Sequence, residues 1–137
     1  AVSEDEMYRR IADISSRFPY LVFEEGGQVI GYAYAHLWQE RAAYCHTWET
    51  TVYVSSSSAR QGIGRQLMSR LIEECRKSGC YVLIACITHG NEASYALHRK
   101  LGFEQVAFFE KVGTKFGKRL DVTDWEFNII FHIHSSY

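Results

Sequence analysis

The sequence lacks the features that mark membrane proteins and nucleic-acid-binding proteins. No apolar run approaches the roughly 20 residues that a helix needs to cross a bilayer, and residues 1–8 are acidic, without the apolar core of a signal peptide. The formal net charge is −1, and lysine and arginine are spread along the chain without forming a basic stripe. Neither nucleic acid nor an anionic membrane is therefore expected as a main partner.

The sequence also lacks a recognisable disulfide or metal-binding pattern. Its four cysteines form no C-x-x-C pair, and none has a histidine at the spacing of a zinc site. They are Cys45, Cys75, Cys80 and Cys86. We expect buried thiols in a reducing compartment, and hence a cytoplasmic protein. His132 and His134 would share one face of a strand, but the sequence offers no third ligand nearby, so no metal is expected.

The composition fits one folded unit. The chain has 137 residues, of which 47% are hydrophobic, and a chain of this length buries one core but not two. There is no internal repeat and no low-complexity segment. We expect a single domain over residues 1–137.

Hydrophobic periodicity predicts a mixed architecture. Ile63, Leu67 and Leu71 recur every four residues, as on the buried face of a helix, whereas residues 81–87 form the continuous apolar run of a buried strand. We expect helices over residues 4–16, 62–77 and 91–101, and strands over residues 20–24, 28–38, 44–54, 81–87, 103–112 and 119–133. This order predicts an α/β protein of the α+β type, with a mixed, mainly antiparallel sheet flanked by helices.

Two of these strands should form a parallel pair that splays apart. A right-handed crossover through the helix over residues 62–77 would place the strands over residues 44–54 and 81–87 side by side and parallel. The chain breaks into a serine loop after Val54. We therefore expect the pair to diverge near Val54 and Ile87.

A glycine-bearing turn opens the helix over residues 62–77. Gly62 and Gly64 would let an anion approach the backbone N–H groups of residues 61–65, with Arg60 and Arg65 adding positive charge. A lone G-x-G is also common at ordinary helix starts, so it does not establish an anion site. The sequence has neither the G-x-x-x-x-G-K-[ST] of a P-loop nor the third glycine of a dinucleotide fold.

Two motifs together resemble the acyl-CoA-binding core of the GNAT N-acyltransferase superfamily. The first is the strand, turn and helix just described, and the second is residues 91–103, which read Asn-x-x-x-x-x-Leu-His-x-x-x-Gly-Phe. Residues 48–54, with Val112-Gly113, residues 115–117 and Asp121-Val122, resemble the phosphinothricin acetyltransferase group. Members usually carry a strand and a helix before the segment that starts this chain, and this sequence has no counterpart of either.

The resemblance implies acetyl-CoA as the acyl donor and no metal. It implies transfer of the acetyl group to the primary amine of a small, acidic, amino-acid-like substrate of the phosphinothricin or methionine sulfoximine type. Related enzymes are often dimers, so a homodimer is also implied. The implied acetyl-CoA-binding residues are Val52, Val54, Arg60, Gln61, Gly62, Ile63, Gly64, Arg65, Asn91 and Ser94. Asn91 and Ser94 would equally serve as simple helix caps.

Glu49 and His98 are the catalytic candidates. Glu49 shares a strand face with Thr51 and Tyr53, and a carboxylate there can take the proton of an attacking amine. From the pattern alone it could equally belong to a solvated face, and the resemblance favours the general base. His98 occupies the position of the group's catalytic histidine, as helper or as leaving-group acid, although a histidine on a helix surface is the plain alternative.

The resemblance places the acceptor amine near Trp38, Arg41, Tyr44 and Tyr53. Three departures bear on the site. Gln39 replaces a lysine of the acceptor loop, and Arg119 stands where an aromatic residue is frequent. Ala59 replaces a Gln or Arg of the pyrophosphate loop. An anionic amino acid remains the expected acceptor, while phosphinothricin itself is in question. A non-catalytic acyl-CoA-binding domain is the alternative function.

Overall fold

The structure is a computed structural model that describes residues 18–58 and 61–131. Its elements in chain order are β1 (Tyr20–Glu25), β2 (Gln28–Leu37), η1 (Ala42–Tyr44), β3 (Thr47–Val54), η2 (Ser56–Ser58), α2 (Ile63–Lys77), β4 (Val82–Thr88), α3 (Glu92–Leu101), β5 (Glu104–Lys115) and β6 (Lys118–Asn128). The helix expected over residues 4–16 lies outside the described residues, as do His132 and His134.

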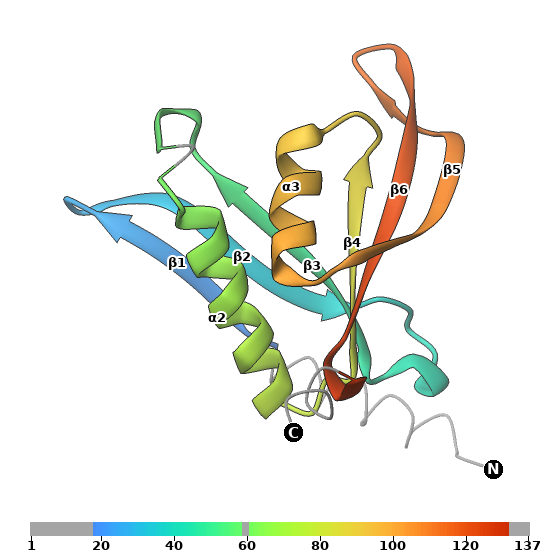
Figure 1. Ribbon diagram of the computed structural model, residues 1–137, viewed down its shortest axis with the longest axis horizontal. Coiled ribbons are helices and arrows are strands. Elements are labelled where there is room, and N and C mark those ends of the chain that lie inside the picture. Colours follow the sequence, from blue (N-terminus) through green and yellow to red (C-terminus); the bar gives the residue numbers. More distant parts are fainter. Residues whose placement is uncertain (1–17, 59–60, 132–137) are drawn as a thin grey trace.

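The described strands form a six-stranded sheet in the order β1-β2-β3-β4-β6-β5. Neighbouring strands run antiparallel except for β3 and β4, which are parallel and are connected through α2. Helices α2 and α3 lie on the same side of the sheet (Figure 1). This arrangement confirms the expected mixed, mainly antiparallel sheet flanked by helices.

The parallel pair splays apart as expected. Pairing between β3 and β4 runs from Thr47 opposite Val82 to Thr50 opposite Ala85 and goes no further. Both strands continue, β3 to Val54 and β4 to Thr88, and they diverge in Figure 1. Beyond Thr50, the edge of β3 that faces β4 therefore has no strand partner.

Several element boundaries differ from the sequence expectation, most of them by a single residue. The third strand begins at Thr47 rather than at residue 44 because the preceding residues form a 3₁₀ turn, in which the Tyr44 N–H donates to the Arg41 carbonyl at 2.9 Å. The last strand ends at Asn128 rather than at residue 133, since residues 129–131 turn helical and the Asn128 side chain accepts the Phe131 N–H. The strands over residues 104–115 and 118–128 also extend closer to their shared hairpin turn than expected.

The core of the described residues lies between the sheet and helices α2 and α3. Helix α2 buries the stripe that its sequence predicts, with Leu67, Met68 and Leu71 nearly inaccessible to solvent. Helix α3 buries Tyr95, whose ring packs on Trp125 of β6 at 5.1 Å. Both helices are thus packed against one face of the sheet, next to the gap between β3 and β4.

The expectation of buried thiols holds for only part of the set. Cys75 and Cys80 are buried, and burial raises the pKa of the Cys80 thiol to about 12. Cys45 is half-buried, whereas Cys86 is exposed, so the expectation is wrong for Cys86. The reason is its place on β4 beyond Ala85, where pairing with β3 has ended and one face of the strand is uncovered.

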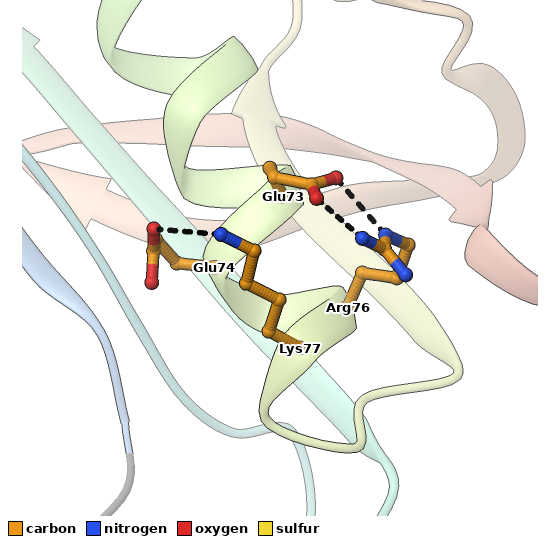
Figure 2. Close-up of polar contacts among 4 residues, drawn as sticks. All are labelled: Glu73, Glu74, Arg76 and Lys77. Atoms are coloured by element: carbon orange, nitrogen blue, oxygen red, sulfur yellow. Dashed lines mark hydrogen bonds and ion pairs between the residues drawn. The ribbon is translucent and has the colours of Figure 1, made fainter.

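The far end of α2 carries ion pairs that lie away from the glycine turn. Arg76 binds Glu73 through two guanidinium nitrogens, and Lys77 lies 3.9 Å from Glu74 (Figure 2). The hydrogen bond from Arg76 holds the pKa of Glu73 below its usual range. Such i,i+3 pairs are exposed, so they add little to stability. Lysine and arginine in the last turn do, however, suit the negative end of the helix dipole.

Candidate active site

The glycine turn shapes the start of α2. Gly62 takes a left-handed conformation with φ of +76° directly before the helix, and no side chain caps the first turn. The first turn also contains no acidic residue. Its N–H groups are therefore available to an anion, with the positive end of the helix dipole behind them.

A cavity of about 710 Å³ lies beside this turn, between β3, α2 and α3. Its lining includes eight of the predicted acetyl-CoA-binding residues. They are Val52, Val54, Gly62, Ile63, Gly64, Arg65, Asn91 and Ser94. Gln61 is exposed beside the cavity without lining it, and Arg60 lies outside the described residues. One concave surface therefore brings together segments far apart in the sequence.

Sequence reasoning found Asn91 and Ser94 but missed the other residues on the α3 side of this cavity. Ala93, Leu97 and Lys100 line it at helical spacing, together with Ala96. Lys100 contributes a cation in addition to Arg65, and both suit a ligand that carries phosphates. The spacing of three and four residues was visible in the sequence, but only the fold shows that this stripe faces the glycine turn. Asn91 also caps α3, because its Oδ1 accepts the Ser94 N–H at 3.1 Å.

A smaller cavity, of about 240 Å³, occupies the gap where β3 and β4 diverge. Glu49 and His98 both line it, and Cys86 lines it from β4. It shares Val52, Asn91 and Ser94 with the larger cavity, so the two adjoin. Both catalytic candidates therefore lie at the same opening.

Glu49 and His98 reach this opening from opposite faces of the sheet. Trp48 is buried under the helices, and alternation along β3 turns the neighbouring Glu49 to the other face. His98 belongs to α3, on the helix side. The divergence of β3 and β4 therefore creates a passage through the sheet that has a candidate proton acceptor at each end.

Glu49 has an ionisable neighbour, His36, that sequence reasoning missed. His36 lies directly opposite it in the register of β2 and β3, and its Nε2 is 3.4 Å from Oε2 of Glu49. The two side chains are 45% and 32% exposed, so the pair is open to solvent. Cross-strand partners have no fixed sequence spacing, which is why the pattern of the chain alone gives no sign of this pair.

His98 is buried, with 2% of its surface exposed. Its Nδ1 lies 2.8 Å from the Ser94 carbonyl, which can only accept, so Nδ1 carries a proton and Nε2 is the other site for proton exchange. Burial lowers the pKa of His98 below its ordinary value of 6.5, and the hydrogen bond to Ser94 opposes this only in part. Near neutral pH the ring is therefore neutral, and Nε2 can accept a proton.

The burial of His98 predicts a pH dependence of folding stability. Because its folded pKa lies below 6.5, the unfolded chain binds the proton more readily, and this contribution to stability is lost as pH falls from 6.5 through the folded pKa. Wild type should therefore lose melting temperature more steeply below pH 6.5 than His98→Asn does. His46→Asn, at an exposed position, should retain the wild-type slope. If melting temperature falls with pH equally steeply in wild type and in His98→Asn, the lowered pKa of His98 is contradicted.

The predicted acceptor residues divide into two groups. Tyr53 lines the larger cavity and stacks on Tyr32 with ring centres 5.4 Å apart. Trp38 and Tyr44 pack edge to face at 5.6 Å, next to the exposed Arg41, in the connection between β2 and β3. These last three line neither cavity. They lie beyond the end of β3 that carries Glu49.

The part of the chain that the structure describes contains neither a metal-binding cluster nor a membrane-spanning helix. Over residues 18–58 and 61–131, no three side chains of histidine, cysteine, aspartate or glutamate are placed to hold a metal ion together. Over the same residues, no helix is both long enough and apolar enough to cross a bilayer.

Comparison with known proteins agrees with this geometry. The chain is 46% identical over 106 residues to the L-amino acid N-acyltransferase MnaT of Escherichia coli, covering 77% of this chain and 62% of that protein. It is 42% identical to the L-methionine sulfoximine/L-methionine sulfone acetyltransferase of Salmonella typhimurium, covering 84% and 67%. The chain thus spans about two thirds or less of the length of these relatives.

A solved structure shows the same fold. It is that of a GNAT superfamily phosphinothricin acetyltransferase from Sinorhizobium meliloti in complex with AcCoA, with a TM-score of 0.78 and 38% identity over 92% of this chain and 69% of that one. Residues 1–103 match the model of the acetyltransferase (GNAT) family. The chain belongs to the GNAT acetyltransferase family, and its resemblance to the phosphinothricin acetyltransferase group is confirmed.

Proposed function

We propose that this chain transfers an acetyl group from acetyl-CoA to the primary amine of a small, amino-acid-like substrate, by direct attack in a ternary complex. The observation that carries the proposal is the passage between β3 and β4. It adjoins the large cavity at the start of α2, and it places Glu49 and His98 at one opening. Donor and acceptor can therefore approach the same point from different sides of the sheet.

The large cavity suits acetyl-CoA. The first-turn N–H groups of α2 would hold the pyrophosphate, with Arg65 and Lys100 near the phosphates. The edge of β3 beyond Thr50 has no strand partner on the β4 side, so its backbone groups are available to the amides of the pantetheine arm. A backbone N–H near Val54 would stabilise the oxyanion that forms when the thioester carbonyl is attacked.

Glu49 is the proposed general base. An alkyl amine with a pKa of roughly 10 is almost wholly protonated at neutral pH, so it must lose a proton before it attacks. Glu49 would accept that proton, directly or through one water. The amine nitrogen then bonds to the acetyl carbon, the carbon–sulfur bond breaks, and the CoA thiolate takes up a proton.

His98 is the proposed helper of Glu49. Burial keeps its ring neutral near neutral pH, which supports proton acceptance at Nε2 over immediate proton donation. It would become a donor to the thiolate only after it has taken a proton from the reacting amine. To act as the leaving-group acid from the start of the reaction, His98 would need a protonated ring, and its burial disfavours that form.

Direct transfer is supported by the state of the neighbouring thiol. Cys86 lines the opening, and its thiol could form a covalent acetyl intermediate. Desolvation raises the pKa of Cys86, and Asp124 and Glu49 raise it further. The thiol therefore stays protonated and weakly nucleophilic near neutral pH, whereas acetyl-CoA is already an activated donor.

An acidic amino acid is the proposed acceptor. The relatives named for L-amino acids and for methionine sulfoximine support this class, and Arg41 is exposed near the Glu49 end of β3. Arg41→Ala should raise the KM of an acidic acceptor about tenfold or more, with little change in the KM of acetyl-CoA, because a charged hydrogen bond contributes about 1.5–3 kcal/mol. Arg70→Ala, on the exposed face of α2, is the charge-matched control. Equal turnover of acidic and neutral amines would count against the assignment.

The cysteines bear on the cellular location of the protein. We place the protein in the cytoplasm because its cysteines are free, with the Cys86 thiol exposed, and such thiols persist in a reducing compartment.

We also propose a homodimer, since β5 lies at the edge of the sheet and exposes Phe108, Phe109 and Val112. A single monomeric species in analytical ultracentrifugation at micromolar concentration would refute the dimer.

The proposed function is tested in two steps. Acetyl-CoA should raise the melting temperature, whereas ATP and NAD at equal concentration should not. Release of CoA thiol is then measured with a panel of acidic, neutral and basic primary amines. Thiol release with at least one small amine supports an enzyme. Stabilisation by acetyl-CoA without release for any amine supports the alternative, a non-catalytic acyl-CoA-binding domain.

A further inference from the structure

The pairing of His36 with Glu49 is a feature that the proposed mechanism does not use. The two residues face each other across β2 and β3, and Nε2 of His36 lies 3.4 Å from Oε2 of Glu49. This is the distance of an ion pair, and a small side-chain movement would make it a hydrogen bond. Each side chain also remains in contact with water.

The protonation state of the His36 ring is constrained by its other nitrogen. Nδ1 lies 2.9 Å from the Leu37 carbonyl oxygen. A carbonyl can only accept a hydrogen bond, so Nδ1 must carry a proton in order to make one. In the neutral ring, Nε2 then has a free lone pair, and that lone pair lies beside Glu49. The atom next to the proposed base is therefore the ring nitrogen that can take up a second proton.

The surroundings of the pair contain neutral and acidic groups. Tyr34 packs against the His36 ring from the same strand, with centres 6.1 Å apart, and Tyr20 of β1 stacks on Tyr34. On β4 and β6, Cys86 and Asp124 lie opposite each other on the face that carries Glu49. These neighbours bring no positive charge to the pair, so a proton on Nε2 would not face a competing cation among them.

We propose that His36 is a positioning residue that acts through Glu49 and receives its proton. The proposal rests on the function proposed above. Glu49 takes the proton from the amine nitrogen, and the proton then moves from the Glu49 carboxyl to Nε2 of His36. This restores the carboxylate and leaves an imidazolium that holds it by charge. An ordinary imidazole binds a proton more tightly than an ordinary carboxylate does, and the exposed ring then releases the proton to water.

This role predicts a specific pattern of kinetics. His36→Gln should lower kcat about tenfold or more at neutral pH, leave the KM of acetyl-CoA unchanged, and lose less at high pH, where the amine deprotonates in solution. In the Glu49→Gln background, His36→Gln should cost nothing further, because a residue that acts through Glu49 has no separate effect. His46→Gln is the matched control at an exposed position, with kcat expected to be unchanged.

Each outcome decides the inference. Melting temperatures and the stabilisation by acetyl-CoA are measured for every variant, so that loss of fold is not mistaken for loss of rate. Full kcat for His36→Gln beside a slow Glu49→Gln would overturn this inference and leave the proposed function intact. Losses that multiply in the double variant would also overturn it, since His36 would then act independently. Full kcat for Glu49→Gln would overturn both this inference and the assignment of the base.

Discussion

Replacing Glu49 by glutamine should lower kcat by about 10²–10⁴, the usual cost of losing one general base. Glutamine keeps the size of the side chain but cannot take the proton of the amine. The KM and the dissociation constant of acetyl-CoA should change little, because Glu49 lines the smaller cavity rather than the larger one. The loss should shrink as pH rises towards the pKa of the amine, where the unprotonated form appears without help.

The matched control is Glu104→Gln, an equal loss of charge at an exposed position on the edge strand β5. Its kcat should equal that of the wild type. If Glu49→Gln keeps near-full kcat at neutral pH while His98→Asn abolishes it, His98 is the base. If both variants remain active, neither residue carries the proton transfer, and the proposed mechanism is wrong.

Replacing Gly62 by aspartate should weaken acetyl-CoA binding at least tenfold, which corresponds to about 1.4 kcal/mol or more. The residue has φ of +76° and lines the large cavity at the start of α2. An aspartate there places a negative charge against the proposed pyrophosphate position. The measurement is the dissociation constant of acetyl-CoA by calorimetry, for variants whose circular dichroism shows a folded protein.

Gly62→Asn separates the charge from the backbone. Asparagine is nearly the same size as aspartate and also tolerates left-handed conformations, and no atom lies within 4 Å of a Cβ added at this position. It should therefore bind acetyl-CoA more tightly than the aspartate variant does. Equal and unchanged affinity for both variants would place the pyrophosphate elsewhere.

The sheet was predictable because its signals are local. Apolar residues recur every four positions in α2, β4 is a continuous apolar run, and an α-helical crossover between neighbouring strands makes them parallel. The start of β3 was not predictable in this way. Residues 42–44 turn because of backbone hydrogen bonds and because the Trp48 indole donates to the Cys45 carbonyl at 2.9 Å. Neither contact can be recognised from the residue types in the sequence.

The site was predictable where it follows one segment and hidden where it joins several. The glycine turn and the region around Glu49 are contiguous motifs. His36 and Lys100 enter the site only through strand register and helix packing. The exposure of Cys86 was misread for a related reason: an apolar run suggests burial on both faces, but the splay uncovers one of them. That the whole chain is one domain stays a prediction.

The central claim is that the acetyl group passes directly from acetyl-CoA to the amine in the gap between β3 and β4. Its sharpest test is the initial rate of CoA thiol release, measured while the concentrations of acetyl-CoA and an accepted amine are varied together. A ternary complex predicts double-reciprocal lines that intersect, and intact mass spectrometry should find no acetylated protein when the amine is left out. Parallel lines, with an acetyl group on Cys86, would show a covalent intermediate and contradict the account, as would the absence of thiol release with every amine tested.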